Sequence, residues 1–453
     1  MDTSNHLGSE KVSRLVFKIA IPSMLAQFVN VLYSIVDRIF VGNIPGVGDL
    51  SLAGVGVCGP IVTMIGAFSF LIGVGGAPLL GIALGEGNRR RAEKILANCF
   101  VMLCAAAAMV TAVVLIFKRP MLLLFGASEV IYPYASAYFT LYVSGTIFAL
   151  LSNGLYQFVI AQGYAKTGMC SIMLGAVLNI ILDPIFIYGF GLGVRGAALA
   201  TILSQAGSAA FVTLFLLKKA DVKITFGGYE KKIMTRVLIM GLTPLIIIAV
   251  DNVMIIAMNA LLQYHGGTEG DTLITVNTIV QSFMLVMTMP LGGISAGTQC
   301  ILSYNYGARQ IDRVHDAQKY IIGLCLGYTA LMFVLARVAG PLFVGMFTSD
   351  PVLNAQACHA IRVCTLFAIP LGAQYAIVDG FTGMGQVKWA LTLSTWRKLV
   401  YFIALFTLPL SGPATSIFYA EPISDLLAFS ISMPVHHYVT PVILRKRVEA
   451  PAE

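Results

Sequence analysis

Long apolar runs separated by short polar linkers recur along the whole chain. An α-helix needs about 20 predominantly apolar residues to cross a bilayer, and these runs reach that length. No polar stretch between them is long enough to form a soluble domain. The pattern therefore predicts an all-α polytopic membrane protein with twelve transmembrane helices. We place these helices at residues 15–41, 51–83, 94–117, 132–161, 168–190, 194–217, 236–263, 273–303, 317–338, 355–382, 389–411 and 415–441.

The second half of the chain repeats the first. One constant shift in numbering aligns Pro22 with Pro244, and the same shift still aligns Gly163 with Gly385, without a gap. Each half holds six predicted helices, so both halves enter the membrane in the same sense. We therefore expect two parallel six-helix repeats, an arrangement in which substrate binds between the halves. The predicted parts are an N-lobe at 1–217, a cytoplasmic connector at 218–235 and a C-lobe at 236–453.

Composition and charge agree with a membrane protein. Hydrophobic residues make up 58% of the chain and charged residues only 11%, against about 25% charged in soluble domains. The net charge of +8 comes mainly from the two tails and alternate linkers, above all the stretch 218–236. Basic linkers stay in the cytoplasm, so we expect both termini there, in a multi-pass protein of the plasma (inner) membrane. The eight cysteines stand singly, which indicates neither a disulfide framework nor a zinc site.

Carboxylates inside the predicted helices are the first candidates for function. Asn179 and Asp183 lie four residues apart, so a helix places both on one face. Pro184 follows directly and disturbs the turn around them. A second carboxylate, Asp37, lies within the first predicted helix. An ionisable residue inside a membrane is costly, and function is its default interpretation. The alternative is a carboxylate satisfied by a neighbouring helix.

These carboxylates break the symmetry of the repeat. The shift that relates the two halves aligns Asp37 with Asn259, and it brings Asp183 opposite apolar residues near Leu405. The chemistry of this site is therefore expected in the N-terminal half only.

The C-terminal half carries other polar residues within its predicted helices. Arg397 needs a partner if it is buried, and we expect either Asp251 or Asp379 to pair with it. We favour a structural ion pair over contact with a substrate. Gln281 and Gln374 either form hydrogen bonds between helices or line a cavity.

Four stretches resemble the multidrug and toxic compound extrusion (MATE) family of secondary transporters. The segment 178–201, LNIILDPIFIYGFGLGVRGAALAT, is similar to the signature of the fifth and sixth helices, and Pro22 followed by Asp-Arg-Ile-Phe-Val-Gly at 37–42 resembles the first. Ser-Tyr-Asn-Tyr-Gly-Ala-Arg at 303–309 and Ser-Thr-Trp-Arg at 394–397 resemble the bacterial DinF-like and MepA-like branch.

The resemblance implies a cation site in the N-lobe, with side chains from the first, fourth, fifth and sixth helices. Carried over by motif, the site falls on Asp37, Asn153, Asn179, Asp183 and Thr201, with Tyr138 beside it. Hard cations take oxygen ligands, so Asp37, Asn179, Asp183 and Thr201 would hold Na⁺. Two neighbouring carboxylates would equally hold a proton. No cofactor other than this coupling ion, H⁺ or Na⁺, is expected.

The favoured function is an antiporter that uses H⁺ or Na⁺ to export amphipathic, often cationic organic compounds by alternating access. The alternative is an exporter or flippase of a specific metabolite or lipid-linked saccharide, which should show a groove lined by several cations. No His-Glu-x-x-His motif is present, and we expect no enzymatic activity. The expected partners are the lipid bilayer and small organic substrates, with no nucleic acid, and we expect a monomer.

Overall fold

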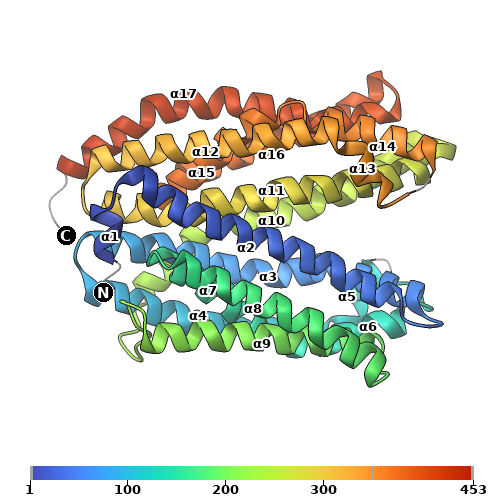
Figure 1. The fold of residues 1–453 in the computed structure, drawn as a ribbon, viewed down its shortest axis with the longest axis horizontal. Helices are drawn as coiled ribbons and strands as arrows, with labels where there is room; N and C mark the ends of the chain where they lie inside the picture. Colours follow the sequence, from blue (N-terminus) through green and yellow to red (C-terminus); the bar gives the residue numbers. More distant parts are fainter. Residues whose placement is uncertain (1–3, 126, 349, 450–453) are drawn as a thin grey trace. The chain divides into compact units, whose positions relative to one another are not determined.

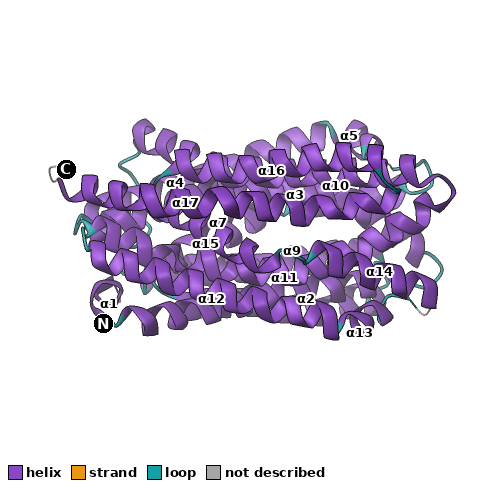
Figure 2. Cartoon of the chain, turned by 90° about the horizontal axis from the view of Figure 1, so that it is seen from above, coloured by secondary structure: helices purple, strands orange, loops and turns teal. Residues whose placement is uncertain are grey.

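The chain is built from helices. The computed structural model describes residues 4–125, 127–348 and 350–449, and within these ranges it contains no β-strand (Figure 2). Ten helices are long and apolar enough to cross a membrane, and two bent pairs raise the number to as many as twelve. The prediction of an all-α protein with twelve spans is therefore confirmed.

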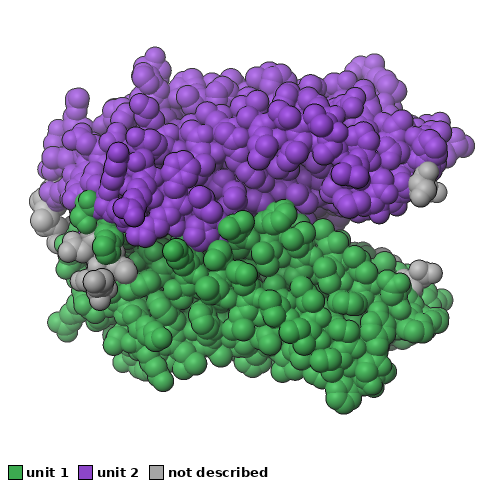
Figure 3. All heavy atoms as spheres, in the orientation of Figure 1, with its two compact units in different colours: residues 1–9, 25–248 green, residues 10–24, 249–453 purple. Residues whose placement is uncertain are grey.

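The helices form two compact units, coloured separately in Figure 3. Unit 1 comprises residues 1–9 and 25–248. Within it α8 packs on α9, and α7 packs on both α3 and α9. Its α-helices are labelled in Figure 1. Its elements are α1 (Ser4–Ser9), the later part of α2 (Val12–Gly42), α3 (Gly48–Gly85), α4 (Arg89–Ile116), α5 (Lys118–Leu124), α6 (Tyr132–Ser144), α7 (Thr146–Ala161), α8 (Ala165–Pro184), the π-helix η1 (Ile185–Gly189), α9 (Val194–Lys218) and the first part of α10 (Lys231–Gly266).

Unit 2 comprises residues 10–24 and 249–453. Within it α12 packs on α15, and α16 packs on α17. Its elements are the first part of α2, the later part of α10, η2 (Gly267–Glu269), α11 (Gly270–Gly307), α12 (Ile311–Val338), α13 (Gly340–Gly345), α14 (Pro351–Cys364), α15 (Ala368–Gly383), α16 (Val387–Ser411), η3 (Ala414–Tyr419) and α17 (Ala420–Glu449).

The helix bounds repeat with the same shift in numbering as the sequence. α3 and α11 begin and end at aligned positions, as do α4 and α12, and α7 and α15. Even the short helix α5 has its counterpart in α13. The duplication therefore extends from single residues to the bounds of whole elements.

Each unit includes the first half of a long helix whose second half belongs to the other unit. In unit 1, α10 approaches α3 so closely that a Cβ on Gly75 would strike the backbone at Val237 and Gly241. In unit 2, a Cβ on Gly297 of α11 would strike the side chain of Ser23 in α2. The lobes predicted at 1–217 and 236–453 are continuous in sequence. The compact units differ from them, because residues 10–24 belong to unit 2 and residues 236–248 belong to unit 1.

Two spans that the sequence predicts as single helices are broken. α6 and α7 meet at 55° and α14 and α15 at 49°. The first break falls at Gly145, where a side chain would strike Ile202. The second precedes Pro370, which lacks the N–H that would continue the helix. In addition, the Thr365 hydroxyl donates to the Ile361 carbonyl oxygen at 2.8 Å. Such a bond from a hydroxyl to the preceding turn bends helices.

Candidate functional site

The end of α8 positions the candidate site in unit 1. α8 ends at Pro184, and the chain continues as the π-helix η1, in which the Phe190 amide donates to the Ile185 carbonyl oxygen at 2.9 Å. π-helical turns are rare and frequently mark functional sites. The irregular turn therefore begins just beyond Asp183.

A hydrogen bond ties this turn to the first long helix. The Tyr188 hydroxyl in η1 donates to the Phe40 carbonyl oxygen in α2 at 2.7 Å, and the two rings meet edge to face. Phe40 lies three residues after Asp37, on the same helix. The bond thus fixes the α2 segment that carries Asp37 against the segment that follows Asp183.

The structure brings Asp37, Asn179 and Asp183 together. The Asn179 side-chain amide donates to Asp183 Oδ1 at 3.3 Å. The carboxyl groups of Asp37 and Asp183 are close enough to share a side-chain hydrogen bond when one of them is protonated. Asn179 is 1% exposed and Asp183 is 0% exposed, and Asp37 is half-buried.

Three oxygens of this group are buried without a hydrogen-bond partner. They are Asp37 Oδ1, Asn179 Oδ1 and Asp183 Oδ2. Leaving a buried acceptor unsatisfied costs about 1–3 kcal/mol, and more for a charged group, and two adjacent carboxylates also repel each other. A proton or a small cation would relieve both costs, because every orphaned atom is an acceptor. A multivalent metal has less support, since no three His, Cys, Asp or Glu side chains form a cluster in the described chain.

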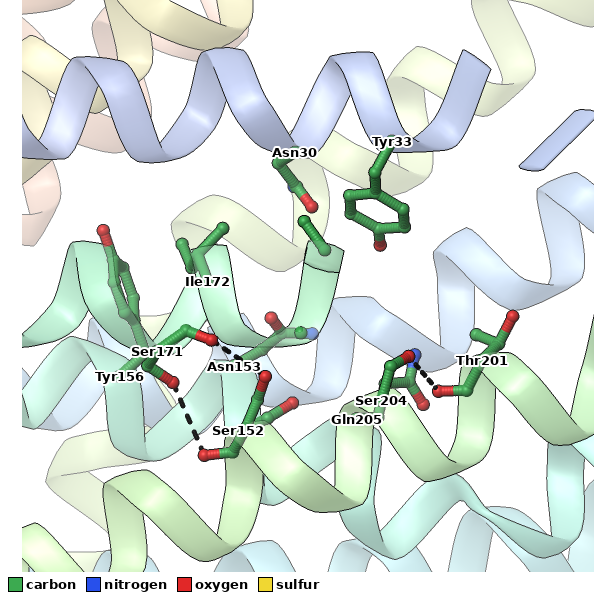
Figure 4. A pocket seen from close by; sticks show the side chains of 13 residues that line it. Asn30, Tyr33, Ser152, Asn153, Tyr156, Ser171, Ile172, Thr201, Ser204 and Gln205 are labelled. Atoms are coloured by element: carbon green, nitrogen blue, oxygen red, sulfur yellow. Dashed lines mark hydrogen bonds between the residues drawn. The ribbon is translucent and has the colours of Figure 1, made fainter. Parts of the chain in front are cut away.

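A polar cavity of about 60 Å³ lies in the same unit. It has room for a few water molecules. Figure 4 shows Asn30 and Tyr33 of α2 pointing toward polar side chains of the other helices. Ser171 and Ser208 form reciprocal bonds from each hydroxyl to the other's carbonyl oxygen, at 3.4 and 2.9 Å. The lining residues are Asn30, Tyr33, Ser152, Asn153, Tyr156, Ser171, Ile172, Gly175, Ala176, Thr201, Ser204, Gln205 and Ser208.

Asn153 and Thr201 line this cavity. Asp37, Asn179 and Asp183 do not line it. The Thr201 hydroxyl donates to the Ala197 carbonyl oxygen of its own helix at 2.9 Å. The residues predicted as one ligand set therefore fall into two neighbouring places, the Asp37–Asn179–Asp183 group and the cavity.

Tyrosines lie between these two places. Tyr138 is buried and stacks on Tyr142 with ring centroids 5.9 Å apart. Both lie within electrostatic range of Asp37, and the Gln205 side chain donates to the Tyr142 hydroxyl at 3.5 Å. Tyr33 lines the cavity and is an electrostatic neighbour of Asp37 as well.

The sequence analysis missed most of the lining residues. Their signal is helical spacing, because Thr201, Ser204, Gln205 and Ser208 follow the i, i+3, i+4, i+7 pattern of one helix face. In the same way, Ser171, Gly175, Asn179 and Asp183 follow one another at intervals of four on α8.

The equivalent places in unit 2 are different. Asn259, which aligns with Asp37, accepts a hydrogen bond from the Asn277 side chain at 2.8 Å. Gln281 continues this chain of amides and donates to Asn277 Oδ1 at 3.5 Å. Leu405 is fully buried in an apolar core. Gln374 is buried and its Oε1 has no partner.

The partner expected for Arg397 is wrong. The guanidinium binds Glu421 at 2.7 Å and Asp425 at 2.8 Å, both on α17. Asp251 instead pairs with Lys398, and Asp379 accepts a hydrogen bond from Ser295. α17 lies beside α16 in the fold, which a pairing argument confined to the earlier helices overlooks.

A duplicated bundle of membrane helices with a buried polar site is the architecture of secondary transporters. The family model MatE matches residues 22–185 and 247–408, well over half of the chain. The chain belongs to the MATE family of membrane transporters.

Relatives of similar length share little sequence identity with this chain. It is 23% identical to the multidrug export protein MepA of Staphylococcus haemolyticus over 444 residues, which cover 96% of each protein. It is 24% identical to MepA of Staphylococcus aureus (strain MRSA252) over 433 residues, 93% of each. A solved structure of an outward-facing multidrug resistance MATE transporter of the MOP superfamily matches with a TM-score of 0.90 and 21% identity, covering 97% of this chain and 98% of that one. This last likeness supports the fold.

Proposed function

We propose that this protein is a cation-coupled antiporter that exports amphipathic, often cationic organic compounds by alternating access. It would work as a monomer in the plasma (inner) membrane with both termini in the cytoplasm. The coupling ion, H⁺ or Na⁺, would bind at Asp37 and Asp183. The names of its relatives, multidrug export proteins, support a broad range of substrates.

The observation that carries this proposal is the group of three orphaned oxygens on Asp37, Asn179 and Asp183. Without a bound ion the two carboxylates repel each other and their acceptors stay unsatisfied. With a proton or Na⁺ bound, both costs fall. The ion therefore stabilises one arrangement of α2 and α8 over another, which is the differential affinity that coupling requires.

The hydrogen bond between Tyr188 and Phe40 would couple the movements of α2 and η1 when the ion binds or leaves. It links the turn after Asp183 to the helix that carries Asp37. A change in the spacing of the two carboxylates would therefore shift η1 and the end of α2 together. The cavity in the same unit is lined by polar side chains, and the ion would reach the carboxylates through it.

The flippase alternative has less support. A lipid-linked phosphate would need unpaired cations, and Arg397 and Lys398 are both bound to carboxylates. A specific small metabolite stays an alternative substrate within the same coupling scheme.

Transport in proteoliposomes tests this proposal, with ethidium as the exported cation and pH and Na⁺ gradients imposed separately. Asp37→Asn and Asp183→Asn should each abolish gradient-driven efflux while ethidium binding to the purified protein persists. Asp312→Asn, an exposed carboxylate at the start of α12, serves as the matched control and should transport like the parent. Full gradient-driven efflux by Asp183→Asn would show that coupling lies elsewhere.

A further inference from the structure

Unit 2 contains a buried group of two carboxylates around one guanidinium, the α16–α17 triad. Arg397 Nε donates to Asp425 Oδ1 at 2.8 Å, and its Nη2 donates to Glu421 Oε1 at 2.7 Å. Asp425 is 0% exposed, and the side chains of Arg397 and Glu421 are 12% and 19% exposed. The triad is therefore almost removed from solvent.

The charges of the triad do not balance. With all three groups ionised, one guanidinium faces two carboxylates and the sum is one negative charge. Lys398 is the next residue along α16, but its ammonium pairs with Asp251, so that pair adds no net charge. Burying an uncompensated charge is costly, and a buried group avoids the cost by binding a proton.

One carboxylate oxygen of Asp425 also lacks a hydrogen-bond partner. Its Oδ1 receives the Arg397 bond, whereas its Oδ2 is buried and has no hydrogen-bond partner. Glu421 is partly exposed, whereas Asp425 is 0% exposed. The more deeply buried of the two carboxylates is therefore the one with the orphaned oxygen, and it gains most from neutralisation.

The titratable groups that surround the triad do not supply the missing positive charge. Tyr375 on α15, Tyr401 on α16 and Cys364 on α14 are its electrostatic neighbours, and each is neutral or anionic. The cations near the triad, Arg397 and Lys398, each have a carboxylate partner already.

The triad is separate from the carboxylates of unit 1. In the repeat, Arg397, Glu421 and Asp425 align with Gly175, Leu199 and Leu203. None of the aligned residues is ionisable, so the triad is a feature of the C-terminal half alone. Each half thus has its own ionisable group at its own place in the duplicated scaffold.

We propose that the α16–α17 triad is a second proton-binding site, in which Asp425 Oδ2 takes up and releases one proton while Arg397 stays charged. The proton changes the charge of the triad from minus one to zero. The protein then has one titratable centre in each half, and the centre in the C-terminal half acts without Asp37 or Asp183.

Infrared spectroscopy of the purified full-length protein tests this, because a protonated carboxyl has a C=O band of its own. The background is the Asp37→Asn/Asp183→Asn variant, which removes the carboxyls of unit 1. At neutral pH this background should retain a carboxylic acid band that shifts on ¹³C-aspartate labelling, is lost in Asp425→Asn and decays as the pH rises. Asp379→Asn, a carboxylate of the same unit outside the triad, should leave that band in place.

Thermal unfolding as a function of pH is a second measurement, which does not depend on the infrared band. Asn mimics the protonated Asp, so Asp425→Asn should match the parent below about pH 4, where the Asp of the unfolded chain is protonated too, and lose less stability than the parent as the pH rises from there. A permanently ionised Asp425 predicts the opposite, with Asp425→Asn less stable at every pH. That result, an unshifted band after ¹³C-aspartate labelling, or no band lost in Asp425→Asn would each overturn the proposal.

Discussion

At Arg397 one side chain holds two carboxylates of the next helix, and this makes its removal costly. Arg397→Met leaves Glu421 and Asp425 facing each other in a buried place. We expect a loss of about 3–5 kcal/mol in the free energy of unfolding, the usual cost of breaking a buried pair. The measurement is thermal unfolding in detergent.

Lys398→Met is the matched control for this change. Its partner Asp251 is 43% exposed, so the carboxylate that is left behind is less buried than Asp425, and the loss should stay below the about 3–5 kcal/mol expected for Arg397→Met. Equal stability of Arg397→Met and the parent would contradict a buried triad.

Single residues also show what the sequence could and could not predict. The grouping of Asn179 and Asp183 follows from helical spacing, and the sequence places Asp37 in the same repeat. The partners of Arg397 did not follow, because several carboxylates were available and only packing decides which helices are neighbours. Asn153 and Thr201 line the cavity and not the carboxylate group, which spacing could not predict because it relates residues within one helix.

At the scale of elements, apolar length predicted all twelve spans, because the bilayer sets the length of a helix. The breaks within two of them were not predicted. Gly145 and Pro370 are ordinary residues of membrane helices, and neighbouring helices decide whether such a residue bends or breaks the span. The π-helical turn after Pro184 was not predicted either. A proline predicts that the helix is disturbed, but it does not predict that the disturbed turn is π-helical.

The close approach of α3 and α10 in unit 1 gives a prediction at this scale. Gly75→Ala places a Cβ against the backbone of Val237 and Gly241, and a backbone atom cannot rotate away. We expect a loss of about 1–3 kcal/mol in the free energy of unfolding, as for overpacked cores. Thermal unfolding of the purified variant in detergent measures it.

Gly66→Ala on the same helix provides the comparison. A Cβ there meets no atom within 4 Å, and Ala is a better helix former than Gly by up to about 1 kcal/mol. This variant should therefore be as stable as the parent or more so. If both variants behave alike, the crossing of α3 and α10 is looser than described.

For the whole molecule, the duplication places two copies of one scaffold in a chain and lets their chemistry diverge. The first copy has paired carboxylates and a polar cavity, and the second has an apolar core and the α16–α17 triad. The half-helices exchanged between the compact units join the two copies through α2 and α10. Ion binding at Asp37 would therefore act on α2, a helix that is divided between the two units.

The topology of the whole molecule can be tested by finding on which side of the membrane the connector lies. The connector at 218–235 is rich in lysine and is held to unit 1, where the Val222 amide donates to Gln162 Oε1 at 2.8 Å and Lys94 binds Glu230 at 2.5 Å. Basic linkers remain in the cytoplasm. In a variant without its eight native cysteines, Lys223→Cys in the connector should resist an impermeant thiol reagent in intact cells.

Tyr264→Cys, at the other end of α10, should react with the same reagent, because one membrane span separates the two positions. Both side chains are exposed in the structure, so access to solvent does not distinguish them. Permeabilised cells are the control, in which both cysteines should be labelled. Labelling of Lys223→Cys in intact cells would place the connector outside, and with it the entry side of the coupling ion would be reversed.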